Sequence, residues 1–118
     1  MVPQLLCKGV YNGFPALVMD LQGPNLNKML KMINKPFTFD CVAQIAVKVI
    51  TALEAIHKEG VIHNALNPDK ILISRMPQDT GVFLIDFKES KKVAIGASKN
   101  RLIFPKFVNR AVRLRAGE

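Results

Sequence analysis

The sequence contains no tryptophan, one tyrosine and only two cysteines in 118 residues. Cys7 and Cys41 are far apart and form no Cys-x-x-Cys spacing, so the sequence predicts neither a disulfide framework nor a zinc site. No run approaches the roughly eighteen apolar residues of a membrane-spanning helix, and the N-terminus lacks the layout of a signal peptide. These absences favour a cytoplasmic protein without membrane contact, with the nucleus as the alternative compartment.

Acidic residues are also few: nine Asp and Glu stand against seventeen Lys and Arg, which gives a formal net charge of +8. The last twenty residues contain six of the basic ones, namely Lys99, Arg101, Lys106, Arg110, Arg113 and Arg115. We interpret this end as a solvated basic segment, and the alternative is anion binding through Arg110, Arg113 and Arg115. With no Trp and one Tyr to stack on bases, nucleic acid is a poor candidate partner.

Hydrophobic residues make up 49% of the chain, which fits one folded domain at most. Apolar runs at residues 3–7 and 14–19 flank an Asn-Gly pair, and this combination predicts a β-hairpin. Asn25 can cap a short amphipathic helix, whose apolar residues recur at helical spacing until Asn34 and Pro36 end it.

A longer helix follows, and its start and stop signals agree. Thr38 suits the N-cap and Asp40 the first turn, while Lys58 lies near the last turn and Gly60 just past the end. The residues between them are almost all apolar, so we expect this helix to be buried on most of its sides.

The polar octapeptide HNALNPDK, residues 63–70, separates the long helix from a second predicted hairpin. The strands of that hairpin are expected at residues 71–73 and 82–85, and the second strand runs into Asp86-Phe87. Two hairpins and two helices predict an α+β fold.

This order of parts resembles the C-lobe of a eukaryotic protein kinase, in which the loop reads H-R-D-x-K-P-x-N and the later motif D-F-G. His63, Pro68 and Asp69 stand at the His, Pro and variable positions of the loop, and the Asp-Phe pair stands at the start of the later motif. Residues 17–26, LVMDLQGPNL, are similar to the L-V-M-x-L-x-G-P-S-L of casein kinase 1 relatives, including the tau-tubulin kinases.

The resemblance implies that residues 1–118 are a partial kinase domain. Residues 1–19 would be N-lobe strands, 20–25 the hinge, 26–89 the start of the C-lobe, and 90–118 a basic tail resembling an activation segment. Because a partial domain leaves an apolar helix stripe and strand edges unpaired, we expect a protein partner or the missing kinase lobes to cover them.

Three loop residues depart from the family pattern. The resemblance places Ala65 at the catalytic Asp, Asn67 at the phosphate-contacting Lys and Lys70 at the metal-binding Asn. Loss of a positioned base typically slows a reaction about 10²- to 10⁴-fold. Asp86 keeps the second metal ligand, but Lys88 replaces the Gly of the later motif. We expect Lys70 to form an ion pair with Asp86 in place of the metal.

Nucleotide binding is the family activity that the remaining residues fit best. The resemblance implies that Met19 is the gatekeeper, that Asp20 and Gln22 present hinge backbone to adenine, and that Leu72 and Ile85 form an apolar floor. ATP would then bind with weak or no contribution from Mg²⁺. The alternative is that the same side chains are ordinary core.

The sequence therefore favours a catalytically impaired, casein kinase 1-like pseudokinase fragment that binds rather than transfers phosphate. One alternative is a piece of an active, ATP-dependent serine/threonine kinase. Another is a basic adaptor that binds anions, with an acidic or phosphorylated peptide as its partner.

Overall fold

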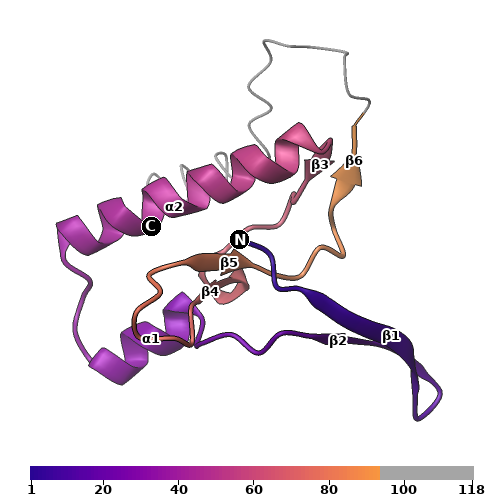
Figure 1. Ribbon diagram of the computed structural model, residues 1–118. Helices are drawn as coiled ribbons and strands as arrows, with labels where there is room; N and C mark the ends of the chain where they lie inside the picture. Colours follow the sequence, from indigo (N-terminus) through magenta and orange to yellow (C-terminus); the bar gives the residue numbers. More distant parts are fainter. Residues whose placement is uncertain (94–118) are drawn as a thin grey trace, which may run out of the picture.

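The structure is a computed structural model that describes residues 1–93, and this part of the chain is a small α+β domain (Figure 1). It contains two α-helices and three separate antiparallel strand pairs, so the predicted class is confirmed. In chain order the elements are β1 (Leu5–Tyr11), β2 (Phe14–Met19), α1 (Leu26–Ile33), α2 (Phe39–Lys58), β3 (Val61–Ile62), the short 3₁₀ helix η1 (Pro68–Lys70), β4 (Ile71–Ile73), β5 (Val82–Leu84) and β6 (Lys91–Lys92).

The predicted first hairpin is confirmed as the pair β1–β2. Asn12 and Gly13 form its two-residue turn with φ angles of 48° and 80°, and positive φ at both positions is the geometry that matches the twist of the flanking strands. Tyr11 therefore faces Phe14 across the turn. Figure 1 shows the hairpin extending away from the two helices.

The predicted caps of both helices are confirmed. The side chain of Asn25 accepts a hydrogen bond from the Lys28 backbone N–H at 2.8 Å, and the Thr38 hydroxyl accepts one from the Cys41 N–H at 3.2 Å. Asn34 ends α1 in the left-handed conformation, which Asn tolerates better than most residues.

The core lies where α2 packs on the β4–β5 pair (Figure 1). The buried apolar residues are Ala52, Leu66, Ile71, Val82 and Leu84. Of these only Ala52 belongs to α2, so the expectation that α2 is buried on most sides is wrong for the described part of the chain. Val47 and Ile50 are each 65% exposed, because the short β4–β5 pair covers one face of a 20-residue helix.

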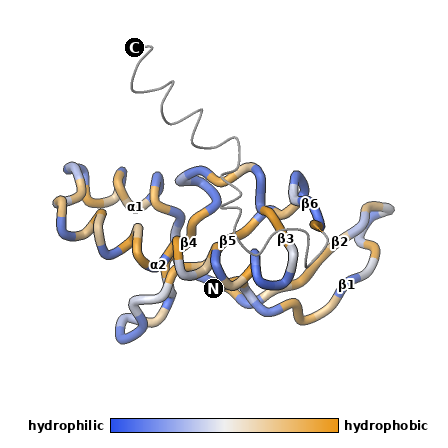
Figure 2. Tube along the Cα trace, turned by 90° about the horizontal axis from the view of Figure 1, so that it is seen from above, coloured by the Kyte–Doolittle hydropathy of each residue, from blue (hydrophilic) through white to orange (hydrophobic). Residues whose placement is uncertain are grey.

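Apolar residues left outside the core run along both α2 and the β1–β2 hairpin, as Figure 2 shows by colour. This agrees with the expectation that an apolar helix stripe would remain unpaired. Among residues 1–93, no helix is long and apolar enough to cross a membrane.

One strand pair was not predicted. Val61 pairs with Lys92 and Ile62 with Lys91, and the Val93 N–H donates to the Gly60 carbonyl at 2.7 Å. Two consecutive lysines carry no apolar alternation, so β6 gives no strand signal in the sequence. Its pairing with β3 brings the residues after Asp86-Phe87 beside the start of the 63–70 loop.

Candidate functional site

His63 joins the 63–70 loop to the Asp-Phe segment. It is 1% exposed, and its Nε2 lies 2.8 Å from the Ile85 carbonyl oxygen, while the Ala65 N–H points at Nδ1 from 3.4 Å. A carbonyl only accepts and an N–H only donates, so in these contacts Nε2 is the donor and Nδ1 the acceptor. The ring also packs against Phe87 at a centroid distance of 4.8 Å and a tilt of 56°.

Both oxygens of Asn67 accept hydrogen bonds from nearby backbone N–H groups. Its side-chain oxygen accepts from the Asp69 N–H at 2.9 Å and so caps η1, and its carbonyl accepts from the Lys70 N–H at 3.0 Å. The Asp69 carboxylate is held in turn by the side-chain amide of Asn27 at 2.8 Å. The residue at the phosphate-contacting position of the resemblance is therefore a neutral cap.

The predicted ion pair between Lys70 and Asp86 is confirmed. Lys70 Nζ lies 3.2 Å from Asp86 Oδ2, and the two side chains are only 16% and 33% exposed. Their backbones are also joined, because the Ile85 N–H donates to the Lys70 carbonyl at 3.0 Å. Asp86, two residues after the end of β5, has a φ of 63°, which is a left-handed conformation.

The charge of Lys70 sets the ionisation of Asp86. Burial raises the pKa of this carboxyl, but the hydrogen bond and charge of Lys70, together with the Lys88 N–H, outweigh burial and hold the pKa below its ordinary value. Asp86 is therefore an ionised carboxylate that the chain itself neutralises.

The residues present do not fit a magnesium ion. Mg²⁺ requires oxygen ligands in octahedral geometry, and the Lys70 ammonium has no lone pair to offer. The Asp86 carboxylate is already paired. Within residues 1–93, no group of three or more His, Cys, Asp or Glu side chains lies close enough together to hold a metal ion.

Two of the five residues predicted to bind a nucleotide, Asp20 and Gln22, line the same hollow. A hollow of about 300 Å³ is lined by Asp20, Leu21, Gln22, Ser74, Arg75, Met76, Asp79 and Phe83. It brings these two residues, which the resemblance places at a kinase hinge, against the β4–β5 turn. Met19, Leu72 and Ile85 are not among its lining residues; Met19 pairs with Leu5, and Leu72 pairs with Phe83.

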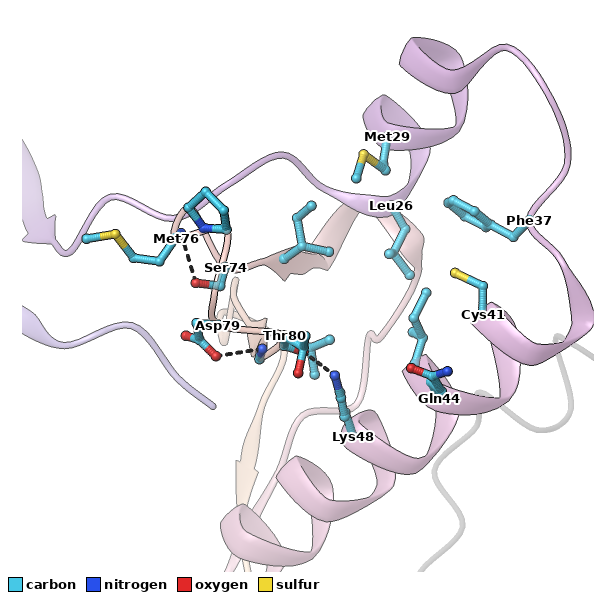
Figure 3. A pocket seen from close by; sticks show the side chains of 15 residues that line it. Leu26, Met29, Phe37, Cys41, Gln44, Lys48, Ser74, Met76, Asp79 and Thr80 are labelled. Atoms are coloured by element: carbon cyan, nitrogen blue, oxygen red, sulfur yellow. Dashed lines mark hydrogen bonds between the residues drawn. The ribbon is translucent and has the colours of Figure 1, made fainter.

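A second hollow, of about 310 Å³, lies between α1, α2 and the β4–β5 turn (Figure 3). Its lining is mostly apolar and includes Leu26, Phe37 and Cys41. At its edge the Lys48 ammonium donates to the Thr80 carbonyl, so this cation is used within the fold. Tertiary packing alone creates this hollow, and no motif in the sequence signals it.

The tail residues Arg110, Arg113 and Arg115 lie outside the described residues. No protein-family model matches the chain. The described residues form a small α+β domain in which the 63–70 loop contacts the Asp-Phe segment through His63 and through the Lys70–Asp86 ion pair.

Proposed function

We propose that this chain is a catalytically impaired, casein kinase 1-like pseudokinase fragment that acts by binding rather than by phosphoryl transfer. The main support is the ion pair between Lys70 and Asp86. The resemblance puts these residues at the two metal-binding positions, and 3.2 Å between an ammonium and a carboxylate leaves neither side chain free for a metal.

At the loop and Asp-Phe positions that the resemblance assigns to phosphoryl transfer, each residue lacks the needed group or is already engaged. The reaction requires an acceptor that orients the substrate hydroxyl, a cation on the transferred phosphate and bound metal ions. Ala65 offers only a methyl group at the acceptor position. Asn67 is uncharged and caps η1, and Lys70 is paired with Asp86. Loss of the base alone would lower the rate about 10²- to 10⁴-fold.

The contacts around His63 support the alignment on which the proposal rests. Fifteen residues, 71–85, separate the loop from the Asp-Phe segment, yet His63 contacts both Ile85 and Phe87. The kinase resemblance requires these two motifs to meet, because each supplies one of the metal ligands.

The test is transfer of radiolabelled phosphate from ATP to casein, with the full chain as the enzyme and both Mg²⁺ and Mn²⁺ supplied. We expect no transfer above background, and no change with the Asp86→Ala variant. An active casein kinase 1 relative in the same buffer is the positive control. Transfer by the wild-type chain that Asp86→Ala abolishes would refute the proposal and support the active-kinase alternative.

A metal-binding measurement separates the ion pair from other causes of inactivity. Lys70→Asn should create an amide oxygen beside Asp86 and release its carboxylate, so Mn²⁺ binding should become stronger than in the wild-type chain. Lys58→Asn is the matched control, because Lys58 also pairs with an acid but lies exposed on α2. Equal Mn²⁺ binding by wild type and Lys70→Asn would show that Lys70 does not occupy a cation position.

A further inference from the structure

The hollow between α1, α2 and the β4–β5 turn is apolar at one end and charged at the other (Figure 3). Leu26, Met29 and Phe37 line the apolar end, and each of them is only half-buried, which leaves apolar surface open to solvent. Lys48 and Asp79 lie away from these three, at the charged end. Apolar walls with a few polar groups around about 310 Å³ are typical of a small-molecule site at the lower end of the usual size range.

One face of α2 forms the wall that joins the two ends. The lining residues of this wall follow one another at i, i+3, i+4 and i+7, which places them on one side of the helix; they are Cys41, Gln44, Ile45 and Lys48. From Cys41 to Lys48 the helix makes two turns and rises by roughly 10 Å. An extended chain of about eight carbons has a similar length, because staggered carbon–carbon bonds are about 1.5 Å long. The hollow can therefore hold a short aliphatic chain along α2.

The Lys48 ammonium is held at the charged end and keeps donors to spare. One of its three N–H groups donates to the Thr80 carbonyl, and two remain. Neither of the ion pairs formed within residues 1–93 includes Lys48. The Asp79 carboxylate accepts from the Gly81 N–H at 2.8 Å; this bond is the main cause that lowers the Asp79 pKa, and the charge of Lys48 contributes less. The Lys48 charge is therefore available to an anionic group, which the net charge of +8 also attracts.

We propose that this hollow binds a small monocarboxylic acid with an apolar tail, of the chemical class of medium-chain fatty acids. The tail lies against Leu26 and Phe37, and the carboxylate meets the ammonium of Lys48. An acyl chain esterified to a larger molecule has the same tail without the charge, so Lys48 selects the free acid. This inference does not depend on the proposed function, because no lining residue belongs to the 63–70 loop or to the Asp-Phe segment.

Alkylation of the two cysteines of the full chain tests the proposal. Cys41 lines the hollow, whereas Cys7 is exposed on β1 and serves as the control within the same molecule. We expect octanoate to slow the reaction of Cys41 with iodoacetamide and to leave Cys7 unchanged, as measured by mass spectrometry of the digested chain. The concentration for half protection should fall about fourfold for each methylene added from hexanoate to decanoate, because each one buries further apolar surface.

Two variants test the carboxylate contact. Lys48→Met keeps an apolar stem and removes the charge, so octanoate should bind roughly 5- to 10-fold more weakly. Methyl octanoate, which carries no charge, should bind the wild-type chain and Lys48→Met equally. Lys58→Met is the matched control, since Lys58 is on the same helix but outside the hollow. Circular dichroism of both variants should match the wild-type chain.

Four outcomes would overturn the proposal. Equal protection of Cys7 and Cys41 would indicate detergent action, and protection that does not change with chain length would exclude burial of the tail. A Cys41 that does not react in the free chain would show that another segment or a second copy fills the hollow. Equal effects of Lys48→Met and Lys58→Met on octanoate binding would show that Lys48 does not hold the carboxylate.

Discussion

The hydrogen bond between His63 and Ile85 should be a principal anchor of the loop, and two substitutions separate its contribution from that of packing. His63→Phe keeps a ring of similar size against Phe87 but leaves the Ile85 carbonyl without its donor. An orphaned buried carbonyl lowers the free energy of unfolding by about 1–3 kcal/mol. His63→Ala removes the donor and most of the side chain, so a cavity term of about 2 kcal/mol is added.

We therefore expect His63→Phe to lower the unfolding free energy by about 1–3 kcal/mol and His63→Ala by about 3–5 kcal/mol. Urea titration followed by far-UV circular dichroism measures both, and the slope of the transition should stay constant. If His63→Ala removes the transition altogether, His63→Phe still carries the test.

A second histidine provides the matched control. Nε2 of His57 is buried without a hydrogen-bond partner among the described residues, so His57→Phe removes a polar atom that makes no bond. We expect this change to be neutral or slightly stabilising. The reasoning would be refuted if His63→Phe left stability unchanged, or if the two histidines responded equally.

Three further predictions concern the ion pair, Gly23 and the nucleotide. Asp86→Asn should lower the melting temperature at neutral pH. Because folding depresses the Asp86 pKa below 3.8, the stability that the carboxylate contributes is present above that value and is lost as the pH falls through the folded pKa. The melting temperatures of wild type and variant should therefore converge in acid. Gly23→Ala should destabilise the fold by about 1–3 kcal/mol in urea titration, because a Cβ there would lie 2.8 Å from the Ile73 carbonyl oxygen, whereas Gly9→Ala, with nothing within 4 Å, should change little. In thermal-shift titrations, any response to ATP should be the same with Mg²⁺ and with EDTA, and a response that needs Mg²⁺ would contradict the role given to Lys70.

The sequence anticipated those elements whose signals are local. Asn25, Thr38 and the Asn-Gly turn act within three or four residues of themselves, and the corresponding caps and hairpin are present. The ion pair between Lys70 and Asp86 could also be predicted, because the motif resemblance gave the two positions a reason to meet.

The prediction of burial failed for α2, because burial depends on the elements that pack around a helix. Helix α2 is apolar almost all round, which predicts burial, but burial requires partner elements and the described residues supply only the short β4–β5 pair on one face. The nucleotide positions were assigned by resemblance and stay a prediction, because whether Met19, Leu72 and Ile85 act together with Asp20 and Gln22 depends on packing that no local pattern encodes.

The sequence by itself determined the helices, the hairpins and the chemical content of the loop, since a methyl group at Ala65 and an ammonium at Lys70 are fixed by residue identity. Only the tertiary structure decided that Lys70 reaches Asp86, that His63 donates to Ile85 and that Val47 and Ile50 of α2 are exposed. These three depend on contacts between residues distant in sequence, and no local pattern encodes the distances.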